Sequence, residues 1–183
     1  NRINISLQKT ATMKKVYILA SLLLVSSLVI TSCKGGGKGD KEAKTNEVIA
    51  EGVVNIIDEE YFRENIWDYS VQPGAFEYKG TVPVVIDFYA DWCAPCKKAA
   101  PVLERLAKTY KGKVMFYKID TDQNRGLASV LQINTIPSFM YIPVKGEPEF
   151  SMGILPTPEL TERMFTDNIE KYLFGNTSIE AVS

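Results

Sequence analysis

A nearly continuous apolar run, VPVVIDFYA at residues 82–90, is the feature that most constrains the fold of this chain. The run does not alternate between apolar and polar residues, so it predicts a central strand that is covered on both faces. A second apolar run at 114–119 predicts another buried strand. Between the two runs, apolar residues recur at helical spacing from Cys93 to Tyr110, and Gly112 ends the pattern. Buried strands joined by a helix favour the α/β fold class, with a mixed sheet and helices on both faces.

The chain from residue 53 onward continues this pattern and predicts the order β-α-β-α-β-α-β-β-α. Asp58 is expected to cap a helix that runs to about Tyr69. Thr157 is expected to cap the last helix, whose apolar stripe includes Leu160. Pro101 lies inside the helix that begins at the cysteine pair and is expected to bend it. The other predicted elements are a strand at 53–57, a helix at 125–131, a strand after the loop that begins at 134, a strand at 147–152 and an end of the last helix at Gly175.

Two cysteines, Cys93 and Cys96 in the stretch DWCAPCKK, come directly after the predicted central strand. Such a pair is half of a zinc site, a structural disulfide or a redox centre. A zinc site needs two more ligands, and the sequence has no histidine and no second CxxC. A structural disulfide that closes so short a loop would constrain the unfolded chain little. A strand before the pair and a helix after it favour the redox centre, because a helix N-terminus stabilises the Cys93 thiolate and places Cys96 on the same face, within reach of a disulfide.

Charge and composition exclude several other functions. The chain of 183 residues has a net charge of −1, and its Lys and Arg residues cluster only in a short run after residue 33. We therefore expect no nucleic-acid partner, because such binding needs a basic surface. The absence of histidine removes Ser-His and Cys-His nucleophiles. We expect no metal and no cofactor.

The first fifty residues have the pattern of an export signal and a tether. Met13 is followed by two lysines and by an apolar run at 16–30, which is shorter than the roughly 20 residues that span a bilayer as a helix. The alternative is a retained transmembrane anchor. The sequence ITSC that ends at Cys33 resembles the bacterial lipobox, which implies cleavage before Cys33 and its acylation; the alternative is a spare thiol. The predicted parts are an upstream segment and leader at 1–32, a flexible tether at 33–47, one domain at 48–175 and a tail at 176–183.

The segment VVIDFYADWCAPCKKAAPVLERLA resembles the active-site region of thioredoxins, from the strand through the WCxPC centre to the proline in the helix. The resemblance continues in YKIDTDQN at 117–124, NTIPSFMYI at 134–142 and KGEPEFSMGILPTPEL at 145–160, and it covers about 53–174. The KGEP…MG stretch is similar to the exported, envelope-located thioredoxins. This resemblance implies the thioredoxin fold and a thiol–disulfide oxidoreductase with a CAPC centre.

The resemblance also implies roles for four residues in the chemistry. Cys93 matches the nucleophile and Cys96 the resolving thiol of one disulfide. Asp87 matches a buried carboxylate that assists proton transfer at the resolving cysteine, and Lys118 matches a lysine paired with it. Independently, an Asp inside VVIDFY lies in an apolar setting, which raises its pKa. The alternatives are an Asp87 that reaches solvent and a Lys118 that merely extends its ammonium to the surface.

Six further positions match residues that contact substrate in thioredoxins. The match between Ile136-Pro137 and the cis-proline loop rests on the resemblance alone, because most X–Pro bonds in folded proteins are trans. Ala94 stands where thioredoxins usually have Gly, a change expected to tune the redox potential without abolishing activity. The positions are Trp92, Ala94, Pro95, Ile136, Pro137 and Gly153.

Two features favour a general reductant, and we expect it to work as a monomer. Family members that oxidise or isomerise disulfides usually carry a histidine where this chain has Pro95. Relatives that act in cytochrome maturation carry an insertion before the cis-proline, whereas Pro137 follows Cys93 here at the compact spacing of 44 positions. A cytochrome-maturation reductase and a non-catalytic binding module with this fold stay open as alternatives. The expected partners are disulfide-containing envelope proteins, a membrane protein that donates electrons and, through the lipid anchor, the membrane, with the domain facing the periplasm.

Overall fold

A computed structural model describes residues 49–71 and 73–176 of the chain. The predicted leader, the lipidated Cys33, the tether at 33–47 and the tail from 177 onward lie outside the described residues. Those assignments therefore stay predictions. Within the two described ranges, no helix is both long enough and apolar enough to cross a bilayer.

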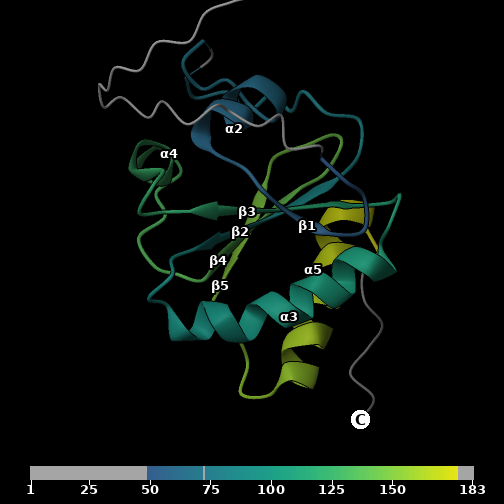
Figure 1. Ribbon diagram of the computed structural model, residues 1–183. Helices are drawn as coiled ribbons and strands as arrows, with labels where there is room; N and C mark the ends of the chain where they lie inside the picture. The colour runs from purple at the N-terminus through teal and green to yellow at the C-terminus, as the bar shows by residue number, and fades with distance from the viewer. Residues whose placement is uncertain (1–48, 72, 177–183) are drawn as a thin grey trace, which may run out of the picture. The chain divides into compact units, whose positions relative to one another are not determined.

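A five-stranded mixed sheet forms the centre of the domain, in the order β1-β3-β2-β4-β5 (Figure 1). The strands β1, β3 and β2 run parallel to one another, whereas β4 is antiparallel to β2 and β5 is antiparallel to β4. The central strand β2 is buried over its first five residues, as its apolar sequence predicts. The strands are β1 (Val54–Ile56), β2 (Val84–Tyr89), β3 (Met115–Asp120), β4 (Ser138–Ile142) and β5 (Glu149–Met152).

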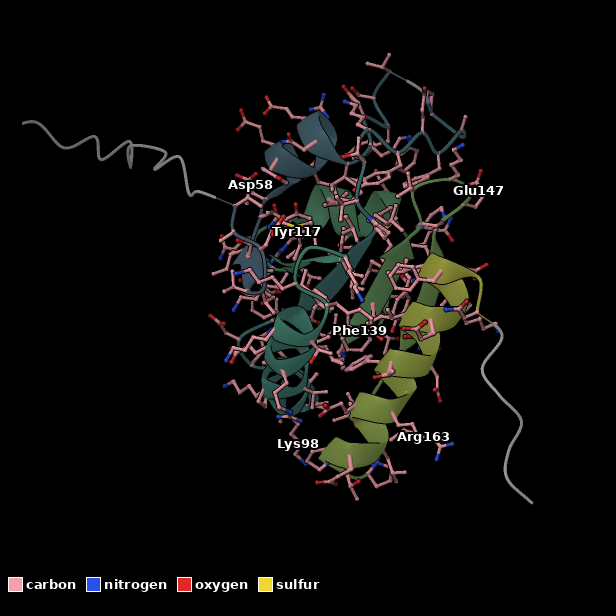
Figure 2. All side chains as sticks on the ribbon, turned by 90° about the vertical axis from the view of Figure 1, so that its right-hand side faces the viewer. Asp58, Lys98, Tyr117, Phe139, Glu147 and Arg163 are labelled. Atoms are coloured by element: carbon pink, nitrogen blue, oxygen red, sulfur yellow. A yellow bond between two sulfur atoms is a disulfide. The ribbon has the colours of Figure 1, made fainter. Side chains whose placement is uncertain are left out.

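Helices cover both faces of the sheet, which confirms the predicted α/β class. In Figure 1, α3 and α5 lie on one side of the sheet and α2 and α4 lie on the other. Each side has its own apolar core. On the α3/α5 side, the ring of Phe139, labelled in Figure 2, packs edge-on against Phe165 at a centroid distance of 4.6 Å. The helices are α2 (Glu59–Asn65), α3 (Ala94–Thr109), α4 (Arg125–Val130) and α5 (Pro158–Phe174).

The alternation of side chains along β2 decides which residues face each core. Val85 belongs to the core under α3 and α5, whereas Ile86 and Phe88 belong to the core under α2 and α4. Because successive side chains of a strand point to opposite faces, Asp87 and Tyr89 share the side of Val85. The strand thus carries a carboxylate and a phenol toward α3.

The predicted helix caps are confirmed. The Asp58 carboxylate accepts the backbone N–H of Tyr61 at 2.8 Å, and the Thr157 hydroxyl accepts that of Leu160 at 3.3 Å. Gly175 ends α5 in the left-handed conformation with φ at 70°. The starts of α2 and α5 and the end of α5 are therefore set by local chemistry that the sequence shows directly.

Two predictions about helices are wrong. The helix α2 ends at Asn65 and not near Tyr69, because the Lys79 ammonium reaches across the chain and donates to the carbonyl of Arg63 at 2.6 Å. Leu160 is 45% exposed and does not join the apolar stripe of α5. Thr161 is buried in its place, since its hydroxyl donates to the Leu155 carbonyl at 3.1 Å and so has a partner in the core.

Candidate active site

A disulfide joins Cys93 to Cys96 at the start of α3. Cys93 is the N-cap residue of this helix: its backbone is extended and its sulfur accepts the N–H of Cys96 at 3.2 Å. Its own N–H donates to the Ala90 carbonyl at 3.0 Å, so the turn out of β2 is held at both ends. Free N–H groups and the helix dipole at this position stabilise a Cys93 thiolate once the disulfide is reduced. The predicted location of the pair, at the helix N-terminus, is confirmed.

The disulfide lies in a small apolar cluster with an exposed rim. Ala90 and the two cysteines are buried, and Tyr89 and Ile136 pack against them. Ala94 and Pro95, the residues between the cysteines, are exposed. Access to the sulfur atoms therefore depends on the few side chains that form the rim.

The cis-proline loop and Gly153, which are both predicted to contact substrate, are next to each other. The Ile136–Pro137 peptide bond is cis, and the Pro137 carbonyl accepts the N–H of Gly153 at 2.9 Å. Gly153 has φ at 74°, which is unfavourable for residues with a Cβ. A Cβ at this position would meet no atom within 4 Å, so the space beside it is open. Backbone conformation, and not crowding within the domain, explains the glycine here.

Trp92 is the most exposed aromatic residue beside the disulfide, with 70% of its surface accessible. Its indole N–H donates to the Asp122 carboxylate at 2.8 Å, which fixes the ring despite its exposure. The Asp122 backbone N–H in turn donates to the Asp120 carboxylate at 2.9 Å, at the end of β3. Sequence reasoning missed Asp122; the available signal was an acidic pair at the end of a buried strand, in KIDTD.

Asp87 is buried in β2, with 3% of its surface exposed. Its Oδ1 atom has no hydrogen-bond partner. Burial raises the pKa of this carboxyl to about 7, and the positive charge of Lys118 acts in the opposite direction. The structure thus contains the buried carboxylate with a raised pKa that the sequence predicts.

Lys118 is the register partner of Asp87 on β3. Among the ion pairs of the described residues, none joins the two side chains directly. The Lys118 ammonium lies instead over the ring of Tyr89, 5.1 Å from its centroid. The two charges therefore act on each other through space, without a contact between them.

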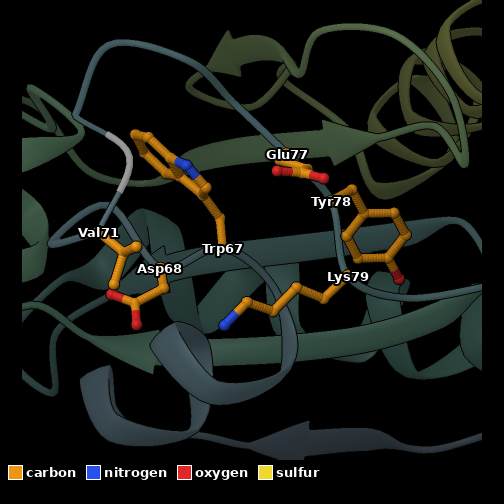
Figure 3. Close-up of a pocket in the computed structure, with 6 residues that line it drawn as sticks. All are labelled: Trp67, Asp68, Val71, Glu77, Tyr78 and Lys79. Atoms are coloured by element: carbon orange, nitrogen blue, oxygen red, sulfur yellow. The ribbon is translucent and has the colours of Figure 1, made fainter.

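A concave region lies away from the disulfide. A pocket of about 270 Å³ is formed by the segment that precedes β2 (Figure 3). The segment enters β2 at its first residue, whereas the disulfide follows its last, so the six residues of the strand separate the two regions. No cysteine lines the pocket, which excludes it as the site of thiol chemistry. Its lining residues are Trp67, Asp68, Val71, Glu77, Tyr78 and Lys79.

No cluster of three or more acidic, histidine or cysteine side chains suited to a metal ion occurs at 49–71 or 73–176. The described site is built from sulfur, one buried carboxylate, one lysine and apolar side chains. Those groups are suited to thiol–disulfide exchange, in which a thiolate attacks a disulfide sulfur and protons move between thiols and a base.

Comparisons with known proteins agree with this chemistry. The family model described as Thioredoxin matches residues 67–165. The thioredoxin of Borreliella burgdorferi is 38% identical over 117 residues, a match that covers 64% of this chain and 94% of that protein. The chloroplastic M-type thioredoxin of Spinacia oleracea is 42% identical over 98 residues, which cover 54% of this chain and about half (51%) of that protein. Among solved structures, a mutant thioredoxin from Halobacterium salinarum matches with a TM-score of 0.51 and 26% identity over 72% of this chain and 97% of that one.

Proposed function

Because this chain belongs to the thioredoxin family, we propose that it is a general reductant that keeps the cysteines of bacterial envelope proteins in the reduced, thiol form. Its class as a protein-disulfide reductase follows from the family and from the Cys93–Cys96 disulfide. The reducing direction and the envelope location are the parts that we propose. The observation that carries the function is the disulfide at the N-terminus of α3, next to the cis Ile136–Pro137 bond.

The reaction has two exchange steps. In the reduced protein, the Cys93 thiolate attacks one sulfur of a substrate disulfide; a mixed disulfide forms, and the other substrate sulfur leaves as a thiolate that takes up a proton. The Cys96 thiolate then attacks the Cys93 sulfur, which forms the Cys93–Cys96 disulfide and releases the second substrate thiol. The substrate gains two electrons and two protons. The disulfide in the structure corresponds to the oxidised product of this cycle.

Asp87 is suited to accept the proton of Cys96 before the second step. A carboxyl whose pKa is raised to about 7 by burial is half-ionised near neutral pH, where a base that both accepts and returns a proton works best. Its unpartnered Oδ1 is available for that proton. A water molecule or a small movement of the strand is compatible with this role, because proton transfer needs only one bridging hydrogen bond.

The residues between the cysteines support the reducing direction. Ala94 and Pro95 carry no charge, so neither adds a cation that would stabilise the reduced pair further and make it an oxidant. The helix N-terminus then stabilises the Cys93 thiolate. We expect a reduction potential nearer to that of thioredoxin, about −270 mV, than to the strong oxidants at about −120 mV.

Substrate is proposed to bind across the exposed rim of the site. Trp92 offers a fixed ring, and the open space beside Gly153 leaves room for a polypeptide backbone next to Pro137. Ala94 and Ile136 complete the surface around the disulfide. A binding surface made mainly of backbone and apolar side chains suits many disulfide-containing proteins and selects weakly among them.

The reductase function is tested with the full chain, a dithiol donor and an insulin-type disulfide substrate. We expect turnover that is lost in Cys93→Ser. The variant Cys96→Ser should accumulate mixed disulfides with substrate, because the second step needs the Cys96 thiolate. Lys98→Gln, a change at an exposed position of α3 near the pair, is the matched control and should leave turnover unchanged. A wild-type protein with both thiols intact and no turnover would overturn the function, and a binding module would keep partners without trapped adducts.

The envelope location rests on the leader and on Cys33, both of which lie outside the described residues. Acylation of Cys33 would tether the domain to a membrane, since several acyl chains give stable anchoring where one is marginal. A membrane protein that donates electrons, and disulfide-containing envelope proteins that accept them, are the partners that follow. Labelling cells with a radioactive fatty acid tests this: Cys33→Ser should abolish the label, and an unlabelled wild-type protein would contradict the anchor.

A further inference from the structure

Three polar side chains lie close together on the α3/α5 side of the sheet. Asp87 and Tyr89 share this side because they are two residues apart on β2. Lys118 joins them from β3 as the register partner of Asp87. The Lys118 ammonium lies 5.1 Å from the centroid of the Tyr89 ring, inside the range of about 6 Å for an attractive cation–π contact.

Tyr89 connects this group to the redox centre. Its ring packs against the cluster of Ala90, Cys93 and Cys96, and it is half-buried. The backbone at Tyr89 is fixed as well, because its carbonyl accepts the N–H of Thr121 at 2.9 Å and the Thr121 hydroxyl at 3.1 Å. The ring is therefore held by the disulfide cluster, and its contact with the ammonium of Lys118 ties that charge to the same cluster.

We propose that Tyr89 is a positioning residue: its ring holds the Lys118 ammonium in place and thereby controls the positive charge that the buried Asp87 carboxylate experiences. This proposal rests on the proposed function in one respect, namely that Asp87 accepts the proton of Cys96. The positioning of Lys118 by Tyr89, and its effect on Asp87, do not depend on where the proton of Asp87 comes from.

Lys118 gains from such a contact, because the attraction of Asp87 acts only through space and does not fix the position of the ammonium. Within the described residues it makes no direct ion pair, and no hydrogen bond of its ammonium to another side chain is present in that part of the chain. A lysine ammonium is strongly hydrated and sits on a flexible stem, so a half-buried one turns to water unless it is retained. The π face of Tyr89 supplies that retention.

The other titratable groups near Asp87 leave Lys118 as its main charge. From β4, Tyr141 feels the charge of Asp87, but burial raises the pKa of Tyr141 to about 12, so it stays neutral. From α3, Cys96 is bonded to Cys93 and does not titrate. Burial, and then the acids Asp120 and Asp91, raise the pKa of the Tyr89 phenol, so that the ring stays neutral too.

The direction of the effect follows from the sign of the lysine charge. A nearby cation favours the ionised carboxylate, and Lys118 does lower the pKa of Asp87 against the larger effect of burial. Without the ring, the ammonium turns toward water and this lowering is lost. Removing the ring should therefore act like removing the lysine charge, and both should raise the pH at which Asp87 ionises.

The test is a pH titration of the Asp87 carboxyl carbon by NMR in the oxidised full chain. Tyr89→Phe keeps the ring and should leave the midpoint unchanged. Tyr89→Leu and Lys118→Met should each raise the midpoint by about half a pH unit or more, and the double variant should shift no further than Lys118→Met alone. Lys171→Met, which removes the ammonium over the Tyr172 ring of α5, is the matched control and should have no effect. If Tyr89→Leu does not fold, Tyr89→Met replaces it.

A midpoint in Tyr89→Leu that equals the wild-type value, or falls below it, overturns the proposal. So does a shift that persists in the Lys118→Met background, because Tyr89 would then act on Asp87 without the lysine. The titration needs no substrate. A wild-type chain that lacks reductase activity but shows these midpoints would refute the proposed function and leave the positioning role of Tyr89 standing. A chain that has reductase activity but does not show these midpoints would refute the positioning role and leave the proposed function standing.

Discussion

Asp87 should make the folded protein less stable as the pH rises. The unfolded chain releases this proton near its ordinary pKa of 3.8, whereas the folded chain releases it near 7. Between these two values the folded state binds more protons than the unfolded state, so the free energy of unfolding falls with increasing pH. The loss begins above the unfolded pKa and is complete above the folded pKa. Replacing Asp87 should therefore stabilise the protein most at alkaline pH.

The size of the gain follows from the pKa difference. A rise from 3.8 to about 7, at about 1.4 kcal/mol per unit, corresponds to a destabilisation of about 4 kcal/mol above neutral pH. At about pH 4.5 the destabilisation is only about 1 kcal/mol, because this pH lies only slightly above the unfolded pKa of 3.8. The small void that Asp87→Ala leaves costs the same at both pH values. The stability difference between variant and wild type should thus grow by about 3 kcal/mol between about pH 4.5 and about pH 9.

Urea unfolding of the oxidised proteins at the two pH values measures this growth. Asp87→Asn serves as a second variant, since it keeps the volume of the side chain and removes only the titration. Asp91→Ala is the control, because Asp91 is exposed and lies four residues further along the chain. If the difference between Asp87→Ala and wild type changes by less than about 1 kcal/mol over this range, the carboxyl does not ionise at a raised pKa and the reasoning is wrong.

Three further substitutions test other parts of the domain. Phe165→Ala should lower the free energy of unfolding by about 3–5 kcal/mol, because it removes the ring that packs on Phe139; a change below about 1 kcal/mol in urea unfolding would argue against a tight core there. Glu59→Ala should cost about 1–2 kcal/mol by the same assay, since the Glu59 carboxylate accepts the N–H of Leu127 in α4, and Glu59→Gln should recover part of the loss. Gly153→Val should cost about 1–2 kcal/mol through its left-handed backbone and should raise the KM for a protein disulfide more than for a small disulfide; equal effects on both would contradict a substrate backbone at this position.

The elements that carry the redox centre could be predicted from the sequence because local signals specify them. The apolar run at 84–89 has no polar face to expose, so it had to be a central strand. The start of α3 is visible in the cysteine pair and in Pro95, which suits the first turn of a helix. Asp87 stands out as a carboxyl in an apolar strand, and its raised pKa follows from burial alone.

The features that were missed depend on polar contacts between different segments of the chain. The end of α2 is set by Lys79, which is separated from it by a whole loop, and the burial of Thr161 depends on a carbonyl in the segment before α5. The contact of Trp92 with Asp122 joins two loops that are 30 residues apart. Hydrophobic periodicity reports which face of one element is buried. Hydrophobic periodicity does not predict which polar group of another element will form a hydrogen bond with that face.

The capping role of Cys93 joins the redox state to the start of α3. The sulfur that accepts the Cys96 N–H is also the atom that is reduced, attacks substrate and is oxidised again. A thiolate accepts a hydrogen bond more strongly than a disulfide sulfur does, so this cap tightens on reduction and loosens on oxidation. Some substitutions stabilise the first turn of α3 more in one redox form than in the other. By linkage, this difference in free energy equals the change in the free energy of thiol–disulfide exchange with substrates. The first turn of α3 is in this sense a regulator of the electron affinity of the protein, even at positions that never touch a sulfur atom.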